Sequence, residues 1–78
     1  MWIVLLAWIA NGQPYAYANG FEMFETKDAC IEYIHKHALS LVVDHNFTIT
    51  DAWHNGTSYY VEVKTSTGSK ETFICDKQ

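Results

Sequence analysis

The sequence predicts an α+β fold in two layers, with one helix packed on an antiparallel sheet and elements in the order β-β-α-β-β-β. Three observations lead to this prediction. The chain opens with an uninterrupted apolar run over residues 2–10, which suits a buried strand. An apolar stripe with helical spacing follows over residues 27–43. The last third of the chain alternates apolar and polar residues between Gly-containing turns.

The opening run is apolar on both of the faces that a strand would present. Successive side chains of a strand point to opposite faces of the sheet, and one helix can cover only one of those faces. Something else must cover the second face, and the functional hypothesis starts from this requirement. The two faces are Trp2, Val4, Leu6 and Trp8 on one side, and Ile3, Leu5, Ala7 and Ile9 on the other.

The same run has the length of the apolar core of a secretory signal peptide, and residues 16–18 (Ala-Tyr-Ala) resemble a cleavage site. No Lys or Arg lies between Met1 and the run, which argues against a signal peptide. A membrane span needs about 20 apolar residues, so we expect no membrane partner. We treat residues 1–78 as a single domain with the opening strand at its centre.

Turn signals define the element that follows the opening strand. The pair Asn11-Gly12 predicts a tight hairpin turn, because both residue types tolerate positive φ. Pro14 lacks an N–H, so the second strand should lie at an edge of the sheet or pair only from Tyr15 onward. Asn19-Gly20 predicts a second turn or a bulge before the helix.

The helix should begin after Thr26, which is a suitable N-cap, and run from Lys27 to about Val43. Asn46 is a suitable left-handed cap at its C-terminus. Three strands should then follow over residues 47–53, 57–65 and 70–75, separated by an Asn-Gly hairpin turn and a Gly-containing turn. The apolar stripe of the helix comprises Cys30, Ile34, Ala38, Leu41 and Val42.

Composition excludes several classes of function. The net charge is −4, and the five basic residues are all Lys. Without Arg or a basic face we expect no binding of long nucleic acid. No catalytic motif or phosphate-binding loop occurs, so we expect neither an enzyme nor a cofactor. The histidines have no metal-binding spacing, and we expect no metal; they are His35, His37, His45 and His54.

Cys30 and Cys75 are the only cysteines in the chain. The helix stripe and the alternation of the last strand predict that their sulfur atoms lie close together. Two interpretations stay open: two buried reduced thiols, or a disulfide that joins the helix to the last strand. The choice depends on the cellular compartment, and we favour reduced thiols.

Four segments carry a resemblance: the Trp-containing strand 2–8, the turn 11–12, the Phe-x-Thr-x-Asp-Ala-Cys stretch 24–30, and the closing strand 73–75 with its second Cys. In these segments the chain is similar to short phage-encoded proteins, mostly without assigned function. The hairpin over residues 47–65 departs from that pattern. The resemblance implies a phage origin and no particular activity.

The first functional hypothesis is a small, non-catalytic interaction module that acts as a homodimer. It would be a phage accessory protein that binds or inhibits a host protein in the cytoplasm of the infected cell. One alternative is a protein that binds a small, nucleotide-like ligand between subunits. Another is a secreted domain stapled by a disulfide. The residues expected at the interface are Trp2, Val4, Leu6, Trp8, Tyr15 and Tyr17.

Overall fold

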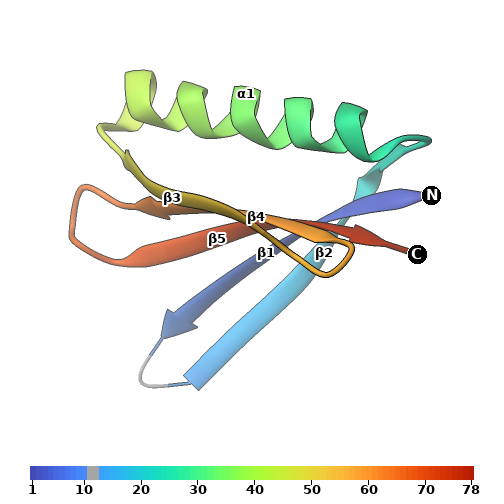
Figure 1. Ribbon diagram of the computed structural model, residues 1–78. Helices are drawn as coiled ribbons and strands as arrows, with labels where there is room; N and C mark the ends of the chain where they lie inside the picture. The colour runs from blue at the N-terminus through green and yellow to red at the C-terminus, as the bar shows by residue number, and fades with distance from the viewer. Residues whose placement is uncertain (11–12) are drawn as a thin grey trace.

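The computed structural model describes the backbone of residues 1–10 and 13–78, and the side chains of residues 1–9, 13–15 and 23–78. The structure is a small α+β domain, in which one helix packs against an antiparallel sheet (Figure 1). The Asn11-Gly12 turn lies outside the described residues. The elements are β1 (Trp2–Ala10), β2 (Gln13–Phe24), α1 (Lys27–His45), β3 (Thr48–Asn55), β4 (Ser58–Lys64) and β5 (Lys70–Lys77).

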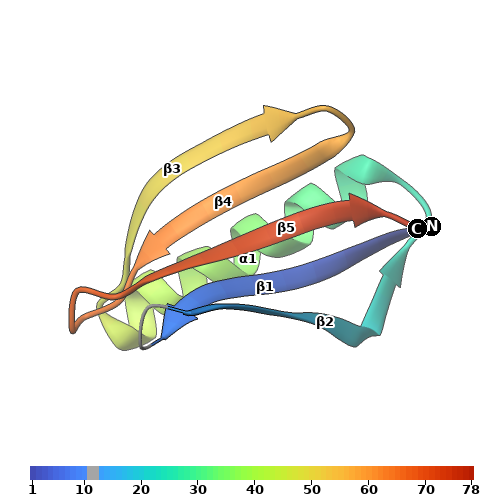
Figure 2. The same ribbon diagram turned by 90° about the horizontal axis from the view of Figure 1, so that it is seen from below.

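The described strands form one five-stranded sheet in the order β2-β1-β5-β4-β3. Every neighbouring pair of strands is antiparallel. We expected the opening strand to be central, but β5 takes the centre and β1 lies between β5 and β2. The two chain ends therefore meet, and the N–H of Gln78 donates a hydrogen bond of 2.9 Å to the carbonyl of Met1 (Figure 2).

The helix begins where the sequence predicts. The N–H of Ala29 donates to Oγ1 of the N-cap Thr26 over 3.2 Å. At the other end Asn46 has a left-handed conformation with φ of 59°, and its N–H donates to the carbonyl of Leu41. This cap sets the end of the helix, so α1 continues to His45 rather than stopping near Val43. Among the described residues, no helix has the length and apolar character that crossing a membrane requires.

β2 is an edge strand that contains a bulge. It pairs only with β1, as Pro14 predicts for an edge strand. In the ladder Ile3 pairs with Met23 but the next residue, Val4, pairs with Asn19, so residues 20–22 have no partner in β1. The turn or bulge predicted at Asn19-Gly20 is therefore a bulge. β2 bends towards the start of α1 at this end (Figures 1 and 2).

The three C-terminal strands differ from the prediction mainly at their ends. β3 and β4 meet in a hairpin at Gly56, whose φ of 63° suits the predicted turn. β5 continues to Lys77 rather than stopping at Cys75, because its last residues pair with the beginning of β1. This extension depends on a partner far away in the sequence, which the local alternation does not reveal.

The core lies between α1 and one face of the sheet. Alternate residues of β4 and β5 point into it, as the sequence pattern predicts. Three residues of the predicted helix stripe meet them and are fully buried. The buried core consists of Val4, Cys30, Ile34, Ala38, Tyr59, Val61, Val63, Phe73 and Cys75.

The N-cap provides a test of how α1 is anchored. Thr26→Ala removes the acceptor for the Ala29 N–H, and we expect the free energy of unfolding to fall by about 1 kcal/mol. Thr26→Ser keeps the hydroxyl and should stay close to the wild type. Urea denaturation followed by circular dichroism measures both. Equal stability of the two variants would show that this cap does not contribute.

Candidate functional site

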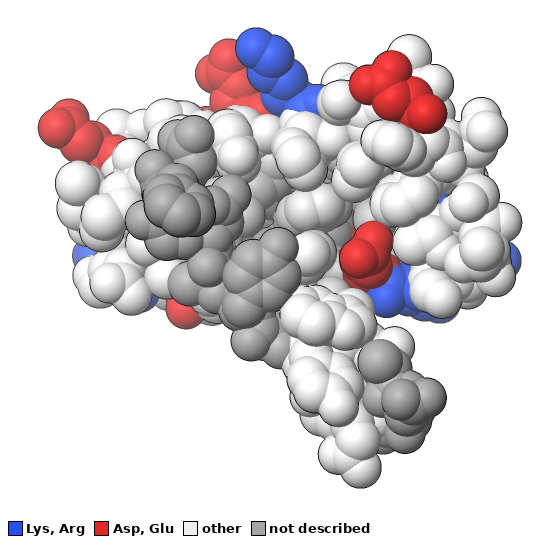
Figure 3. Space-filling model, turned by 180° about the vertical axis from the view of Figure 1, so that it is seen from behind, with Lys and Arg blue, Asp and Glu red and all other residues white. Residues whose placement is uncertain are grey.

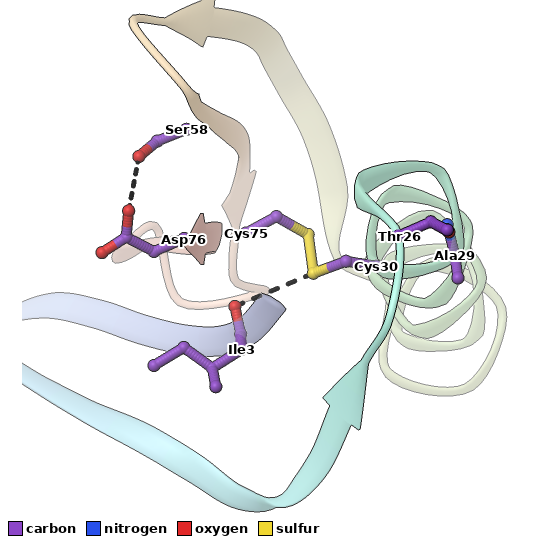
Figure 4. Close-up of a disulfide and its surroundings, with 7 residues drawn as sticks. All are labelled: Ile3, Thr26, Ala29, Cys30, Ser58, Cys75 and Asp76. Carbon is purple, nitrogen blue, oxygen red and sulfur yellow. Dashed lines mark hydrogen bonds between the residues drawn. A yellow bond between two sulfur atoms is a disulfide. The ribbon is translucent and has the colours of Figure 1, made fainter. Parts of the chain in front are cut away.

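Cys30 and Cys75 form a disulfide that joins the N-terminal part of α1 to β5 (Figure 4). Their Cα atoms lie 6.0 Å apart, a separation that a disulfide allows. The predicted proximity is confirmed, and the structure contains the disulfide rather than the reduced thiols that we favoured. Both side chains are fully buried, and Cys30 Sγ lies 3.7 Å from the carbonyl oxygen of Ile3. Thiol exchange requires access to a sulfur atom, so this disulfide has a structural role in the folded chain.

The predicted interface residues on β1 lie on the helix side of the sheet. Val4 is 3% exposed in the core, and Trp2 and Leu6 pack against the same cluster. Lys27 Nζ lies 5.6 Å from the centre of the Trp2 ring, which is cation–π geometry. Val4 is too deeply buried between α1 and the sheet to contact a protein partner, so its assignment to a protein interface is corrected. The covered face of β1 is the one that we had expected to be exposed.

Two of the remaining predicted interface residues, Trp8 and Tyr15, pair near the turn of the β1–β2 hairpin. The rings of Trp8 and Tyr15 stack with centroids 5.7 Å apart, and the Tyr15 side chain is 47% exposed. This end of the hairpin projects from the body of the molecule, and few charged side chains surround it in the view from behind (Figure 3). The side chain of Tyr17 lies outside the described residues.

The face of the sheet opposite α1 carries a row of four apolar side chains across four strands. In the ladders Leu5 pairs with Ile74, Ile74 with Tyr60, and Tyr60 with Trp53. The Trp53 and Tyr60 rings stack in parallel, with centroids 5.0 Å apart. All four side chains are partly exposed, and no described element covers them (Figure 2). We call these four residues the apolar row.

Polar groups border the apolar row on both sides. On one side the Ser58 hydroxyl donates to the Asp76 carboxylate over 2.7 Å (Figure 4). On the other side Glu62 accepts a hydrogen bond of 2.9 Å from Thr50 and lies 3.8 Å from Lys70 Nζ. This arrangement, an apolar centre with a polar margin, is typical of protein interfaces.

A cleft of about 230 Å³ lies on the other side of the sheet, between α1 and strands β1 and β5. The sequence patterns considered above did not predict this cleft. The i, i+4, i+8 spacing of Tyr33, His37 and Leu41 was the available signal, because it places all three on one flank of the helix. The full lining is Val4, Leu6, Tyr33, His37, Leu41, Phe47, Glu71 and Phe73.

Two of the other histidines, His35 and His54, lie at Tyr59, whereas the His45 ring lies beside Phe47. His35 Nε2 lies 2.7 Å from the Tyr59 hydroxyl, and the His54 ring centroid lies 4.6 Å from that of Tyr59. Within the described part of the chain, no three His, Cys, Asp or Glu side chains gather as a metal-binding group. These contacts hold β3, β4 and α1 together.

Removal of the disulfide tests its role in stability. The cysteines lie 45 residues apart in sequence, and closing a loop of this size stabilises a fold by about 4 kcal/mol in the chain-entropy model. A Cys30→Ala/Cys75→Ala variant should therefore unfold at much lower urea concentration than the oxidised wild type. Reductant should destabilise the wild type and leave the double variant unchanged. Two titratable thiols in unfolded protein prepared without reductant would contradict the disulfide.

Comparison of the chain with protein-family models, with curated proteins and with solved structures finds no match. The resemblance to short phage proteins therefore rests on its four sequence segments alone. Two surfaces of the protein have the chemistry of a binding site, the apolar row and the cleft.

Proposed function

We propose that this protein is a non-catalytic interaction module that acts as a homodimer, with the apolar row at the centre of the dimer interface. One observation carries the proposal. Leu5, Ile74 and Tyr60 continue into Trp53 as one apolar surface, on a face that no described element covers. The proposal keeps the interaction hypothesis from the sequence and moves its surface to the opposite face of β1.

The energetics favour covering this face. Monomers rarely expose a contiguous apolar patch of more than several hundred Å². Burial of about 400 Å² of apolar surface contributes on the order of 10 kcal/mol before the cost of association, which offsets much of it. Tyr60 and Trp53 also belong to the residue types that contribute most to binding at interface centres.

A second copy of the chain suits this surface because the margins of the apolar row carry both negative and positive charges. Asp76 borders the row on one side, and the pair of Glu62 and Lys70 borders it on the other. A two-fold axis through the row would bring the apolar side chains of both copies together and leave the charged groups at the wet margin. The phage resemblance makes a host protein the alternative partner for the same face.

The disulfide bears on where such a dimer would act. Disulfides persist in oxidising compartments and are rare in the cytoplasm. The bond between Cys30 and Cys75 therefore favours the secreted alternative over the cytoplasm of an infected cell. The dimer proposal itself does not depend on the compartment.

A charge placed in the apolar row tests the dimer. Leu5→Glu should convert the protein to a monomer, because association would bury a carboxylate without a partner. Leu39→Glu is the matched control, since Leu39 is 55% exposed on α1, far from the row. Sedimentation velocity over a range of micromolar concentrations gives the oligomeric state, and circular dichroism confirms that both variants fold.

The oligomeric states of these variants show which surface forms the dimer interface. A wild-type dimer that Leu5→Glu splits and Leu39→Glu leaves intact supports the proposal. A wild-type chain that is monomeric at high micromolar concentration overturns the homodimer. A dimer that survives Leu5→Glu but dissociates with Trp8→Glu would assign the interface to the projecting hairpin instead.

A further inference from the structure

The cleft beside α1 exists because β1 diverges from the helix along its length. Near its start β1 lies under α1, and Val4 is buried there. Further along, β1 turns away towards the projecting end of the hairpin (Figure 1). The C-terminal half of the helix therefore does not close over Leu6 and Phe73, and the cleft opens between them and Leu41.

Most of the cleft surface is apolar and rigidly held. Its floor consists of Val4 and Phe73, which are 3% and 6% exposed and belong to the core. Leu6, Leu41 and Phe47 form the walls, and each of them packs against that core. The His37 ring meets Phe73 edge-on, with centroids 5.4 Å apart. A site that is preformed in this way avoids much of the ordering cost of binding.

The size of the cleft limits its ligand. Its volume of about 230 Å³ exceeds that of a cavity known to hold benzene, about 150 Å³. It is below the 300–1,000 Å³ typical of sites for drug-sized ligands. The largest ligand that fits the cleft is therefore roughly one bicyclic ring system. This is smaller than a nucleotide, which argues against the nucleotide-like ligand considered from the sequence.

The polar groups of the cleft favour a cation. Among the lining side chains that the structure describes, Glu71 is the one carboxylate, and none is Lys or Arg. Glu71 lies on the helix side of β5, in alternation with Phe73 and Cys75. His37 adds an imidazole that can accept a hydrogen bond. Lys36 lines a neighbouring hollow with Tyr33 and His37, not the cleft itself. A phosphate or carboxylate would meet Glu71 without a basic partner in the lining.

We propose that this cleft binds a small aromatic or branched aliphatic amine, with its apolar body on Phe73 and Leu41 and its ammonium group at Glu71. A charge-assisted hydrogen bond to the carboxylate would orient the ligand, and apolar contacts would supply most of the affinity. The site lies on the opposite side of the sheet from the apolar row. It is therefore independent of the proposed dimer.

Three matched ligands test this site in the oxidised, full-length protein. Naphthylmethylamine, naphthalenemethanol and naphthoate share one ring system and differ in charge. Titration followed by amide chemical shifts should show saturable binding of the amine at residues of α1 and β5 that line the cleft. The amine should bind about tenfold more tightly than the alcohol, and naphthoate more weakly than either.

Variants connect the binding to the cleft. Glu71→Gln should remove the preference for the amine over the alcohol, whereas Glu32→Gln, on the exposed side of α1, should leave it unchanged. Leu41→Trp should fill the cleft and abolish binding of both ligands. Because Leu41→Trp can disturb the core, Leu6→Phe serves as a second filling variant, and urea denaturation shows that each variant is folded.

Several results would overturn the proposal. They are the absence of saturable shifts with the amine, a preference for naphthoate, or shifts that map to the apolar row. Binding that is unchanged in both folded filling variants would also contradict it. Repeating the titration with Leu5→Glu separates the two proposals, because the cleft should bind the amine equally well whether the protein is a dimer or a monomer.

Discussion

The insertion of the C-terminal strand between two hairpins is the interaction on which the rest of the structure depends. β5 pairs with β1 over one edge and with β4 over the other, so it turns two separate hairpins into one sheet. A two-stranded hairpin alone is marginally stable in water. The disulfide from Cys30 attaches α1 to this same strand. The chain therefore completes its core only when its last residues are in place.

This arrangement gives the two faces of the sheet different roles. The 19-residue helix covers one face and completes the core there. It leaves the cleft open where the β1–β2 hairpin diverges from it. On the other face the central strand places Ile74 between Leu5 and Tyr60, so the uncovered apolar groups merge into one surface. The same strand order thus creates both candidate sites.

Local sequence signals predicted the local features well. Thr26 and Asn46 are the caps of the helix, and the alternation of β4 correctly separates its buried from its exposed side chains. The meeting of Cys30 with Cys75 also followed from these patterns. The central position of β5 and the cleft could not be predicted in this way. Both depend on pairing and divergence between segments that are distant in the sequence, which leave little trace in local periodicity.

The outward face of β1 was ambiguous for a physical reason. Both faces of this strand are apolar, and a shift of register by one residue would exchange them at little cost in hydrophobic burial. Neighbouring residues would then change sides, with Leu5 entering the core and Leu6 leaving it. The disulfide resolves this ambiguity for the central strand, because Cys75 can reach Cys30 only when it points towards α1. Cys75 faces Val4 in the ladder, so the register of β1 against β5 then decides which face of β1 is buried. The covalent link therefore fixes which side of β5 faces α1, and the pairing of β1 with β5 completes the surface that the protein presents.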